Sequence, residues 1–400
     1  MWKPELLAPA KNLERLKVAI TYGADAVYVG GQKYGLRARA DNFTDYDLEQ
    51  AVTFAHHHEA KVYVTLNAFP HDEDLEGLGE YCQFLDTIGV DAVIVSDLGM
   101  IRVIQRHSQL NIHLSTQASC LNAYGGQLWK QLGIQRLIVG RELSIAEGGL
   151  IREKSSLEVE MFTHGAMCMA YSGHCTISNF TAGRDSNRGG CIQSCRFPYQ
   201  IENSGKTSEA AVTLMSSKDL WGIDQIAAFF QHRICSLKIE GRMKSSFYVA
   251  TTCRAYRQLI DAYAEDRLTA DLFNQIAAEL ESVPHRDYCS GSLEQVAAAD
   301  SVYQQFHNNN TGTHNYLGIV VETTADKIIL QLFEPLTVGD QIEIIPVQGK
   351  PIDWVVNQLF SIVGDRIDSM RKDSIVCLPK SPELIPLQKV EKLNVVRVLI

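Results

Sequence analysis

The sequence lacks the features that mark several large classes of protein. No apolar run reaches the roughly 20 residues of a membrane-spanning helix, so no membrane association is expected. The start Met1-Trp-Lys-Pro has neither the basic region nor the apolar core of a signal peptide. No Gly-x-Gly-x-x-Gly or P-loop pattern is present, which leaves nucleotide cofactors of those kinds without support. We therefore expect a cytoplasmic protein.

Positive charge is also scarce. Lysine and arginine number 37 against 47 aspartates and glutamates, and the formal net charge is −10. Because non-specific affinity for nucleic acid grows with accumulated basic residues, this composition argues against indiscriminate binding to a polyanion. A local basic patch would form if the fold gathered a few separated side chains; otherwise these are solvated charges or ion pairs. The candidates are Arg184, Arg188, Arg196, Lys238, Arg242 and Lys244.

Cysteine is the residue that stands out. Four of the ten cysteines fall in one short stretch with the spacing Cys168-x6-Cys175-x15-Cys191-x3-Cys195, among glycine, serine and asparagine. A disulfide framework is not expected in a reducing compartment, so metal, cluster or redox chemistry remains. Four thiolates can hold zinc or a 4Fe-4S cluster, and the wide, unequal spacing favours the cluster. A catalytic role for Cys168 or Cys175 is an alternative, although no cysteine-protease signature accompanies them.

The first 160 residues repeat one pattern, a β-branched run followed by a helical stretch and a glycine, as in Gly23-Ala-Asp-Ala-Val-Tyr-Val and Gly89-Val-Asp-Ala-Val-Ile-Val. Repeated βα units indicate a parallel sheet covered by helices. Seven such strands, with Ser236 to Arg242 as the eighth, predict a (β/α)8 TIM-like barrel over residues 1–268. A doubly wound open sheet is the alternative. The predicted strands are Glu5–Ala8, Ala26–Val29, Lys61–Asn67, Ala92–Ser96, Ile112–Ser115, Leu137–Gly140 and Glu158–Phe162.

The predicted seventh and eighth strands are separated by a long insertion, residues 164–235, which holds the four cysteines. An insertion there emerges at the C-terminal face of a barrel, where active sites are built, so the cysteines should cap the mouth. A hairpin within residues 197–215 and a helix beginning at Lys218 are expected in it. Residues 269–314 are predicted to form a helical segment and linker. Residues 315–400 carry short β-branched runs between turns, which predicts a small antiparallel β-barrel domain.

Several side chains beside these strand ends are candidates for chemistry. Glu240 and Arg242 end the eighth strand, and Arg242 suits bidentate binding of a carboxylate or phosphate. Arg37 and Arg39 follow the second strand on a loop at the same mouth and would suit a dianionic small molecule. For both pairs, local ion pairing is the competing interpretation.

Two histidines flank the first cysteines. His164 lies at the end of the seventh strand and His174 directly precedes Cys175. Either side chain could titrate near neutrality and act as acid, base or substrate donor, although a lone histidine is more often structural.

Three segments carry a resemblance to a known family. The opening Glu5-Leu-Leu-Ala-Pro, the block Phe162-Thr-His-Gly-Ala-Met-Cys and the segment Ser236-Leu-Lys-Ile-Glu-Gly-Arg resemble the collagenase-like peptidases, unclassified peptidase family 32. The resemblance covers almost the whole chain. It is strongest for the long branch, whose members include a tRNA 5-hydroxyuridine synthase.

The resemblance implies oxygen-independent hydroxylation. Family members hydroxylate a wobble uridine in tRNA, a cytidine in ribosomal RNA or a ubiquinone precursor, with 4Fe-4S clusters and with prephenate implicated as the hydroxyl source. It implies that Cys168, Cys175, Cys191 and Cys195 are the cluster ligands here, with tRNA and prephenate as partners and a second family member as a candidate partner. Trp221 stands where the quinone branch often has a ligand, which favours the tRNA branch. The alternatives are a collagenase-like metallopeptidase and a zinc-stabilised RNA-binding protein.

Overall fold

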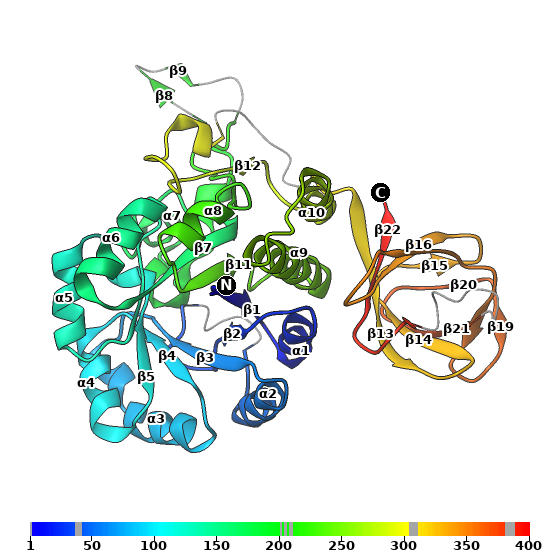
Figure 1. The fold of residues 1–400 in the computed structure, drawn as a ribbon, viewed down its shortest axis with the longest axis horizontal. Coiled ribbons are helices and arrows are strands. Elements are labelled where there is room, and N and C mark those ends of the chain that lie inside the picture. Colours follow the sequence, from blue (N-terminus) through cyan, green and yellow to red (C-terminus); the bar gives the residue numbers. More distant parts are fainter. Residues whose placement is uncertain are drawn as a thin grey trace.

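A closed parallel barrel forms the larger part of the protein (Figure 1). The computed structural model describes residues 2–36, 42–200, 202–203, 206–207, 211–303, 311–380 and 389–400. The strands follow one another around the barrel in chain order, and β11 closes it by pairing with both β1 and β7. This confirms the predicted TIM-like barrel over the open sheet. The barrel strands are β1 (Glu5–Pro9), β2 (Ala26–Val29), β3 (Lys61–Leu66), β4 (Ala92–Val95), β5 (Asn111–Leu114), β6 (Arg136–Ile138), β7 (Glu158–Ala166) and β11 (Ser236–Glu240).

The helices that cover the barrel begin at capping residues, and several of them end just before a glycine. Thr44 and Ser144 form capping boxes that satisfy the first backbone N–H groups of α2 and α6. Gly23, Gly89 and Gly133 follow helix ends with φ of 103°, 84° and 86°, a region that favours glycine. The helices are α1 (Leu13–Thr21), α2 (Asp45–His57), α3 (Leu78–Thr87), α4 (Leu98–His107), α5 (Ala123–Gln131), α6 (Ile145–Ser155) and α9 (Ser246–Ala264).

The insertion differs from prediction in one element. The helix expected from Lys218 is wrong: β10 (Asp219–Trp221) pairs antiparallel with the end of β7, and α8 (Ile226–Gln231) begins later. The nine residues of β7 run past the barrel, and this projecting edge holds the following segment extended. A strand β12 (Tyr288–Cys289) pairs with the outer side of β10. The predicted hairpin is present as a bridge between Tyr199 and Val212, with β8 (Glu202–Asn203) and β9 (Lys206–Thr207) beyond it. The remaining elements of the insertion are α7 (Ile177–Ala182), η3 (Ser186–Gly190) and η4 (Ser194–Arg196).

The C-terminal region is an antiparallel sheet that curls into a half-barrel around its own apolar core, as the sequence predicts. Its strand order is β17-β16-β22-β13-β14-β21-β18-β19, and β15 and β20 form a separate pair. The strands are β13 (His314–Thr323), β14 (Lys327–Leu332), β15 (Leu336–Thr337), β16 (Gln341–Ile345), β17 (Ile352–Val355), β18 (Leu359–Ser361), β19 (Arg366–Ile367), β20 (Ser369–Met370), β21 (Ile375–Pro379) and β22 (Val395–Leu399).

The half-barrel is docked on the outer helices of the TIM barrel rather than tethered loosely to it. The buried Tyr22 hydroxyl at the end of α1 donates to the Ile345 carbonyl at 2.5 Å and accepts from the Val395 N–H at 3.1 Å. Arg397 pairs at 2.9 Å with Glu279 on α10 (Ala270–Ser282). These buried bonds join the two regions on the side of the molecule shown at the right of Figure 1.

Candidate active site at the barrel mouth

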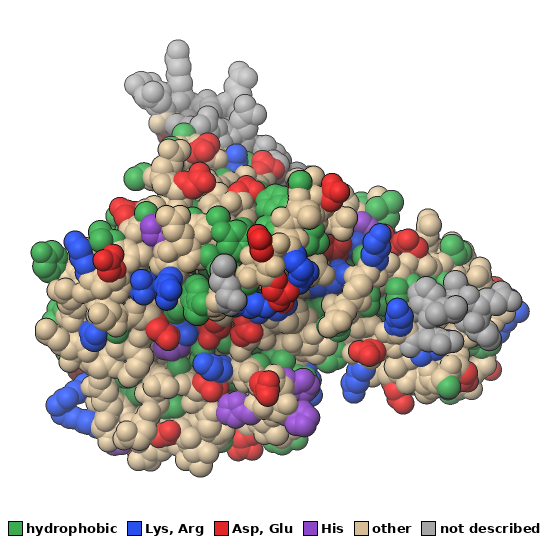
Figure 2. All heavy atoms as spheres, viewed as in Figure 1, with side chains coloured by type: hydrophobic (Ala, Val, Ile, Leu, Met, Phe, Trp, Pro, Cys, Tyr) green, Lys and Arg blue, Asp and Glu red, His purple; other side chains and the backbone are tan. Residues whose placement is uncertain are grey.

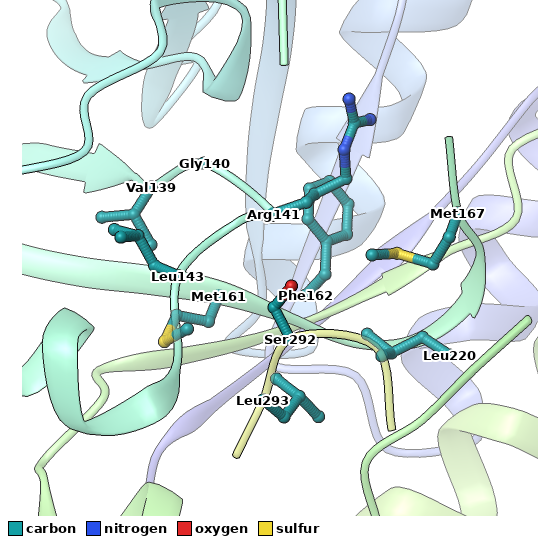
Figure 3. Close-up of a pocket in the computed structure, with 10 residues that line it drawn as sticks. All are labelled: Val139, Gly140, Arg141, Leu143, Met161, Phe162, Met167, Leu220, Ser292 and Leu293. Carbon is teal, nitrogen blue, oxygen red and sulfur yellow. The ribbon is translucent and has the colours of Figure 1, made fainter. Parts of the chain in front are cut away.

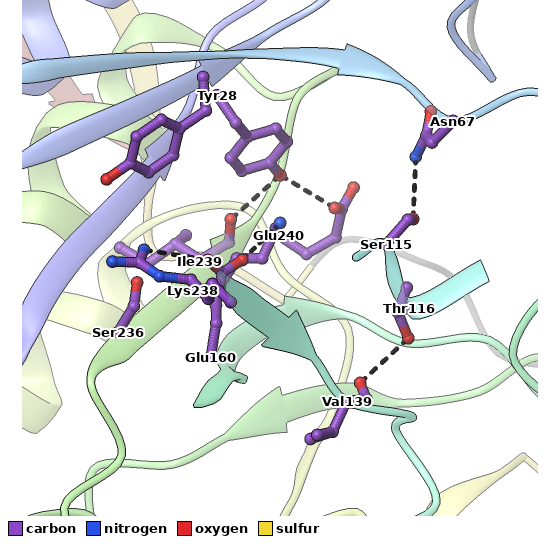
Figure 4. A network of polar contacts seen from close by, with 12 residues as sticks. Tyr28, Asn67, Ser115, Thr116, Val139, Glu160, Ser236, Lys238, Ile239 and Glu240 are labelled. Atoms are coloured by element: carbon purple, nitrogen blue, oxygen red, sulfur yellow. Dashed lines mark hydrogen bonds and ion pairs between the residues drawn. The ribbon is translucent and has the colours of Figure 1, made fainter. Parts of the chain in front are cut away.

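Two of the predicted catalytic residues lie together where β11 ends. Tyr28 donates a 3.0 Å hydrogen bond to the Glu240 carboxylate, which fixes that carboxylate above the barrel interior (Figure 4). Arg242 is only 5% exposed and donates to the Asn42 side chain. Its guanidinium lies so close to Gly30 that a Cβ at Gly30 would clash with it. The structure thus brings an acid and an arginine to the mouth. Their catalytic roles stay predictions.

Beneath the mouth, the barrel interior holds a layer of charge that the sequence analysis missed (Figure 4). Glu160 on β7 is fully buried and accepts from Lys238 at 2.8 Å and from Arg136 at 3.4 Å. Arg136 also pairs with Glu5 at 2.6 Å. The Lys238 ammonium lies 4.5 Å from the centre of the Tyr28 ring. The sequence does contain an indication of this charged layer. Glu158 and Glu160 alternate along a buried strand, and a carboxylate buried on such a strand requires a buried partner.

His164 is not directed into the barrel. The register of β7 against β11 shifts between Lys238 and Ile239, and the shift turns His164 outward, where it packs against Tyr248 and Tyr256 on α9. Its side chain is 1% exposed, and its Nδ1 lies 3.4 Å from the Tyr256 hydroxyl. Burial lowers the pKa of His164 to about 3, with Asp219 acting in the opposite direction. The imidazole is therefore neutral at neutral pH, and its buried Nε2 has no hydrogen-bond partner among the residues that the structure describes.

Five of the six basic side chains named as candidates for a patch are buried or paired, which is the alternative interpretation that the sequence left open. Lys238 and Arg242 are each 5% exposed inside the barrel or at its mouth, and Lys244 donates at 2.9 Å to the Pro284 carbonyl. Arg196 donates at 2.6 Å to the Ser217 carbonyl, and Arg188 pairs with Asp74 at 3.0 Å. Arg196 and Lys244 therefore bind backbone carbonyls and Arg188 binds the partly exposed Asp74, so these side chains hold the structure. On the face shown in Figure 2, basic and acidic side chains are interspersed.

The cysteine insertion crosses the mouth, as predicted. At one end, the Ser172 hydroxyl accepts a hydrogen bond from the loop after β5. The Ser172 N–H donates at 2.8 Å to the Glu142 carboxylate in the loop after β6. Gly173 lies against the Gln117 carbonyl, where a Cβ would approach it to 2.0 Å. At the other end, the Asn187 carbonyl accepts from the Phe69 N–H after β3 at 3.0 Å. The insertion therefore spans from one side of the barrel to the other.

The four cysteines lie within this span or beside its two ends, and their side chains are partly open. Cys168 and Cys191 are exposed, and Cys175 and Cys195 are half-buried. Burial raises the pKa of the Cys195 thiol, Arg196 opposes that shift, and the charges of the other three cysteines raise the pKa further. The other three thiols are thus near enough to Cys195 for their charges to act on it. Among the described residues, however, no three His, Cys, Asp or Glu side chains are grouped closely enough to hold a single metal ion.

The packing of the insertion bears on whether a cluster fits there. Between residues 168 and 200, all of which the structure describes, the buried residues are serines and one glycine, and no hydrocarbon side chain is buried. The buried serines are Ser172, Ser178, Ser186 and Ser194. A segment of this length without an apolar core needs another source of stability, which a cluster on four thiolates would supply. The donor set and the packing fit a 4Fe-4S cluster, which offers one iron to each thiolate, better than a single ion that needs all its ligands on one centre.

The other predicted residues contribute less to this picture. His174 is exposed on the insertion. Arg37 and Arg39 lie outside the described residues. A narrow crevice between the loop after β6 and the end of β7, lined by Arg141, Phe162 and Met167 among others, has an internal volume of about 10 Å³ (Figure 3). That volume is at the lower limit for one water molecule, so the crevice is not a substrate site.

The family model for peptidase family U32 matches residues 11–302, which include the cysteine insertion and every barrel strand except β1. The chain belongs to peptidase family U32. Members of this family differ in what their names say they act on. The tRNA hydroxylation protein P1 of Bacillus subtilis (strain 168) is 40% identical over 379 residues, covering 92% of this chain and 90% of its own.

Two further U32 relatives represent other activities. The 23S rRNA 5-hydroxycytidine C2501 synthase of Escherichia coli (strain K12) is 33% identical, covering 85% of this chain but 52% of its own length. A collagenase of Porphyromonas gingivalis (strain ATCC BAA-308 / W83) is 30% identical and covers 72% of each chain. Within the part of the chain that the structure describes, no helix is long and apolar enough to cross a membrane.

Proposed function

We propose that this protein hydroxylates a uridine of tRNA at C5, at the wobble position. The observation that carries the proposal is the 40% identity to a tRNA hydroxylation protein over nine-tenths of both chains. The rRNA synthase matches with only half of its length, and the collagenase is less similar and covers less of the chain. A tRNA substrate would place the protein in the cytoplasm.

In this proposal the insertion carries a 4Fe-4S cluster on Cys168, Cys175, Cys191 and Cys195. The cluster would supply the redox or substrate-activating chemistry. Two observations support the cluster. The charges of the other three cysteines act on the pKa of Cys195, and no hydrocarbon side chain is buried between residues 168 and 200. The protein would position the cluster, because the insertion that carries the cysteines is bound to loops on both sides of the barrel mouth.

Replacing the C5 hydrogen of uridine by hydroxyl is a two-electron oxidation, so the reaction needs both an oxygen source and an acceptor for two electrons. We propose prephenate as the source of the hydroxyl oxygen, with the two electrons passing to a separate external electron acceptor. The two carboxylates of prephenate would need cations at the mouth, and Arg242 beside Glu240 is the described arginine in that position. Arg37 and Arg39 remain the predicted second pair of cations for the same dianion.

Peptidase activity is the second candidate, and the collagenase relative favours it. The experiment that separates the two is a nucleoside profile of bulk tRNA, measured by mass spectrometry, from a strain in which this gene is deleted. Loss of 5-hydroxyuridine derivatives, restored by the wild-type gene and not by Cys191→Ser, supports hydroxylation. An unchanged profile together with gelatin or collagen cleavage by the purified protein would favour the peptidase.

A further inference from the structure

A hollow of about 330 Å³ opens beside the cysteine insertion, within the size range of small-molecule sites. Three loops line it. The loop after β2 contributes Tyr34 and Gly35, the loop after β3 contributes Phe69 and Asp74, and the insertion contributes Arg188. The hollow is distinct from the charged barrel interior, which lies beneath the mouth.

Backbone bonds hold the three loops in this arrangement. The Ala68 N–H donates to the Tyr34 carbonyl at 3.0 Å, and the Phe69 N–H donates to the Asn187 carbonyl at 3.0 Å. Each bond joins a different pair of loops. The Tyr34 hydroxyl also donates to the Glu76 carbonyl at 3.1 Å, which fixes its ring against the wall. The hollow is therefore preformed rather than created by a ligand.

The charges around the hollow limit what it can bind. Arg188 is paired with Asp74 at 3.0 Å, so among the described lining residues the net charge comes from the exposed Lys33, Glu73 and Glu76 and is negative. A dianion such as a dicarboxylate would be repelled. A neutral, flat ligand that carries hydrogen-bond donors suits this lining. The carboxylates can accept hydrogen bonds from its N–H groups, and the Tyr34 and Phe69 rings provide apolar surface for its faces.

We infer that this hollow receives the target uracil base of the tRNA, turned out of its stack, with Phe69 and Tyr34 as stacking surfaces. The inference rests on the proposed function and adds the place where the substrate base binds. Uracil is neutral and its imide N–H is a donor, as the lining requires. Bases that undergo enzymatic chemistry are commonly held in this way, between apolar side chains and polar groups on the base edge.

The position of the hollow relative to the cysteines supports the same assignment. The Asn187 side chain donates to the Cys175 carbonyl at 3.0 Å, and Arg188 precedes Cys191 by three residues in the chain. The wall of the hollow is thus the segment that joins the second and third cysteines. A base bound there lies next to the quartet proposed to hold the cluster.

The inference can be tested by tRNA binding as well as by hydroxylation. Binding is measured with two synthetic anticodon stem-loops, one with the target uridine and one with an abasic site in its place. The wild-type protein should prefer the first. Phe69→Ala should abolish that preference, a loss of about 5- to 100-fold for one stacked base, and Phe69→Trp should retain it. Phe180→Ala is the matched control, because Phe180 is 88% exposed on the same insertion.

The outcomes separate the two proposals. If the wild type forms 5-hydroxyuridine and Phe69→Ala still prefers the uridine stem-loop, the base does not bind in this hollow and the inference is wrong, although the proposed function stands. If the wild type hydroxylates no tRNA, the proposed function fails first. A photocross-link from 4-thiouridine at the target position should fall on peptides containing Tyr34 or Phe69. A cross-link on the C-terminal half-barrel instead would also overturn the inference.

Discussion

Neutralising one buried carboxylate in the barrel should destabilise the protein far more than neutralising its exposed neighbour. Glu160 has no exposed surface and is the carboxylate that Lys238 contacts at 2.8 Å. In Glu160→Gln the Lys238 ammonium, itself 5% exposed, keeps its charge and loses that partner. Removal of one member of a buried ion pair costs about 3 to 5 kcal/mol. At about 2 °C of Tm per kcal/mol for a large domain, Tm should fall by roughly 6 °C or more.

The same strand provides the control. Glu158 also pairs with Arg136, at 2.9 Å, but its side chain is 57% exposed. Because exposed pairs contribute about 0 to 1 kcal/mol, Glu158→Gln should change Tm by no more than about 2 °C. The double variant Glu160→Gln with Lys238→Met removes both charges and should recover part of the loss. Thermal unfolding followed by circular dichroism measures all three variants. Equal falls in Tm for Glu160→Gln and Glu158→Gln would refute the reasoning, since Glu160 is buried against Lys238 whereas Glu158 is exposed.

Three other predictions concern separate parts of the molecule. Cys195→Ser should abolish the iron content and visible absorption of anaerobically purified protein, and Cys377→Ala in the C-terminal sheet should retain both. Tyr22→Phe should lower the free energy of unfolding in urea by about 1 to 3 kcal/mol, because it leaves the buried Val395 N–H unpaired; Tyr124→Phe, 84% exposed, should have no effect. Burial lowers the pKa of His164 to about 3. Below about pH 6.5 the unfolded chain therefore binds a proton on this imidazole that the folded chain does not bind. Stability should therefore fall by about 1.4 kcal/mol per pH unit as the pH drops below 6.5, and His164→Phe should show a correspondingly weaker slope between pH 6.5 and 4.

The barrel was predictable because its information is local. Apart from β7, which runs four residues past the predicted end at Phe162, each predicted barrel strand coincides with an observed one to within about two residues at either end, since the β-branched runs are bounded by helix signals and turn residues. The glycine that follows each of several helices, such as Gly89 with φ of 84°, marks the boundary directly. Eight such units leave few ways of closing a sheet.

The features that escaped prediction depend on contacts between distant segments. Asp219–Trp221 has nothing in its own sequence that excludes a helix, and it is extended because β7 projects beyond the barrel and offers an edge. Likewise, simple alternation along β7 places His164 on the same side as Glu160, and only the register shift against β11 turns it outward. Lys238 could be recognised as basic but not as the partner of Glu160, which lies 78 residues away in the chain.

The insertion illustrates how a segment can be positioned firmly without a core of its own. It is fixed at two points, by Ser172 on the loops after β5 and β6 and by Asn187 on the loop after β3, whereas residues 168–200 bury hydroxyls instead of hydrocarbon. Hydroxyl contacts contribute little apolar transfer free energy, so the two fixed points set where the cysteines lie and not how tightly the segment is packed. A cofactor bound by the four thiolates would then act as the core of the insertion. The hollow beside Arg188 should consequently lose its shape when the cysteines are replaced, and uridine-dependent binding of the anticodon stem-loop should fall in Cys191→Ser even where no hydroxylation is measured.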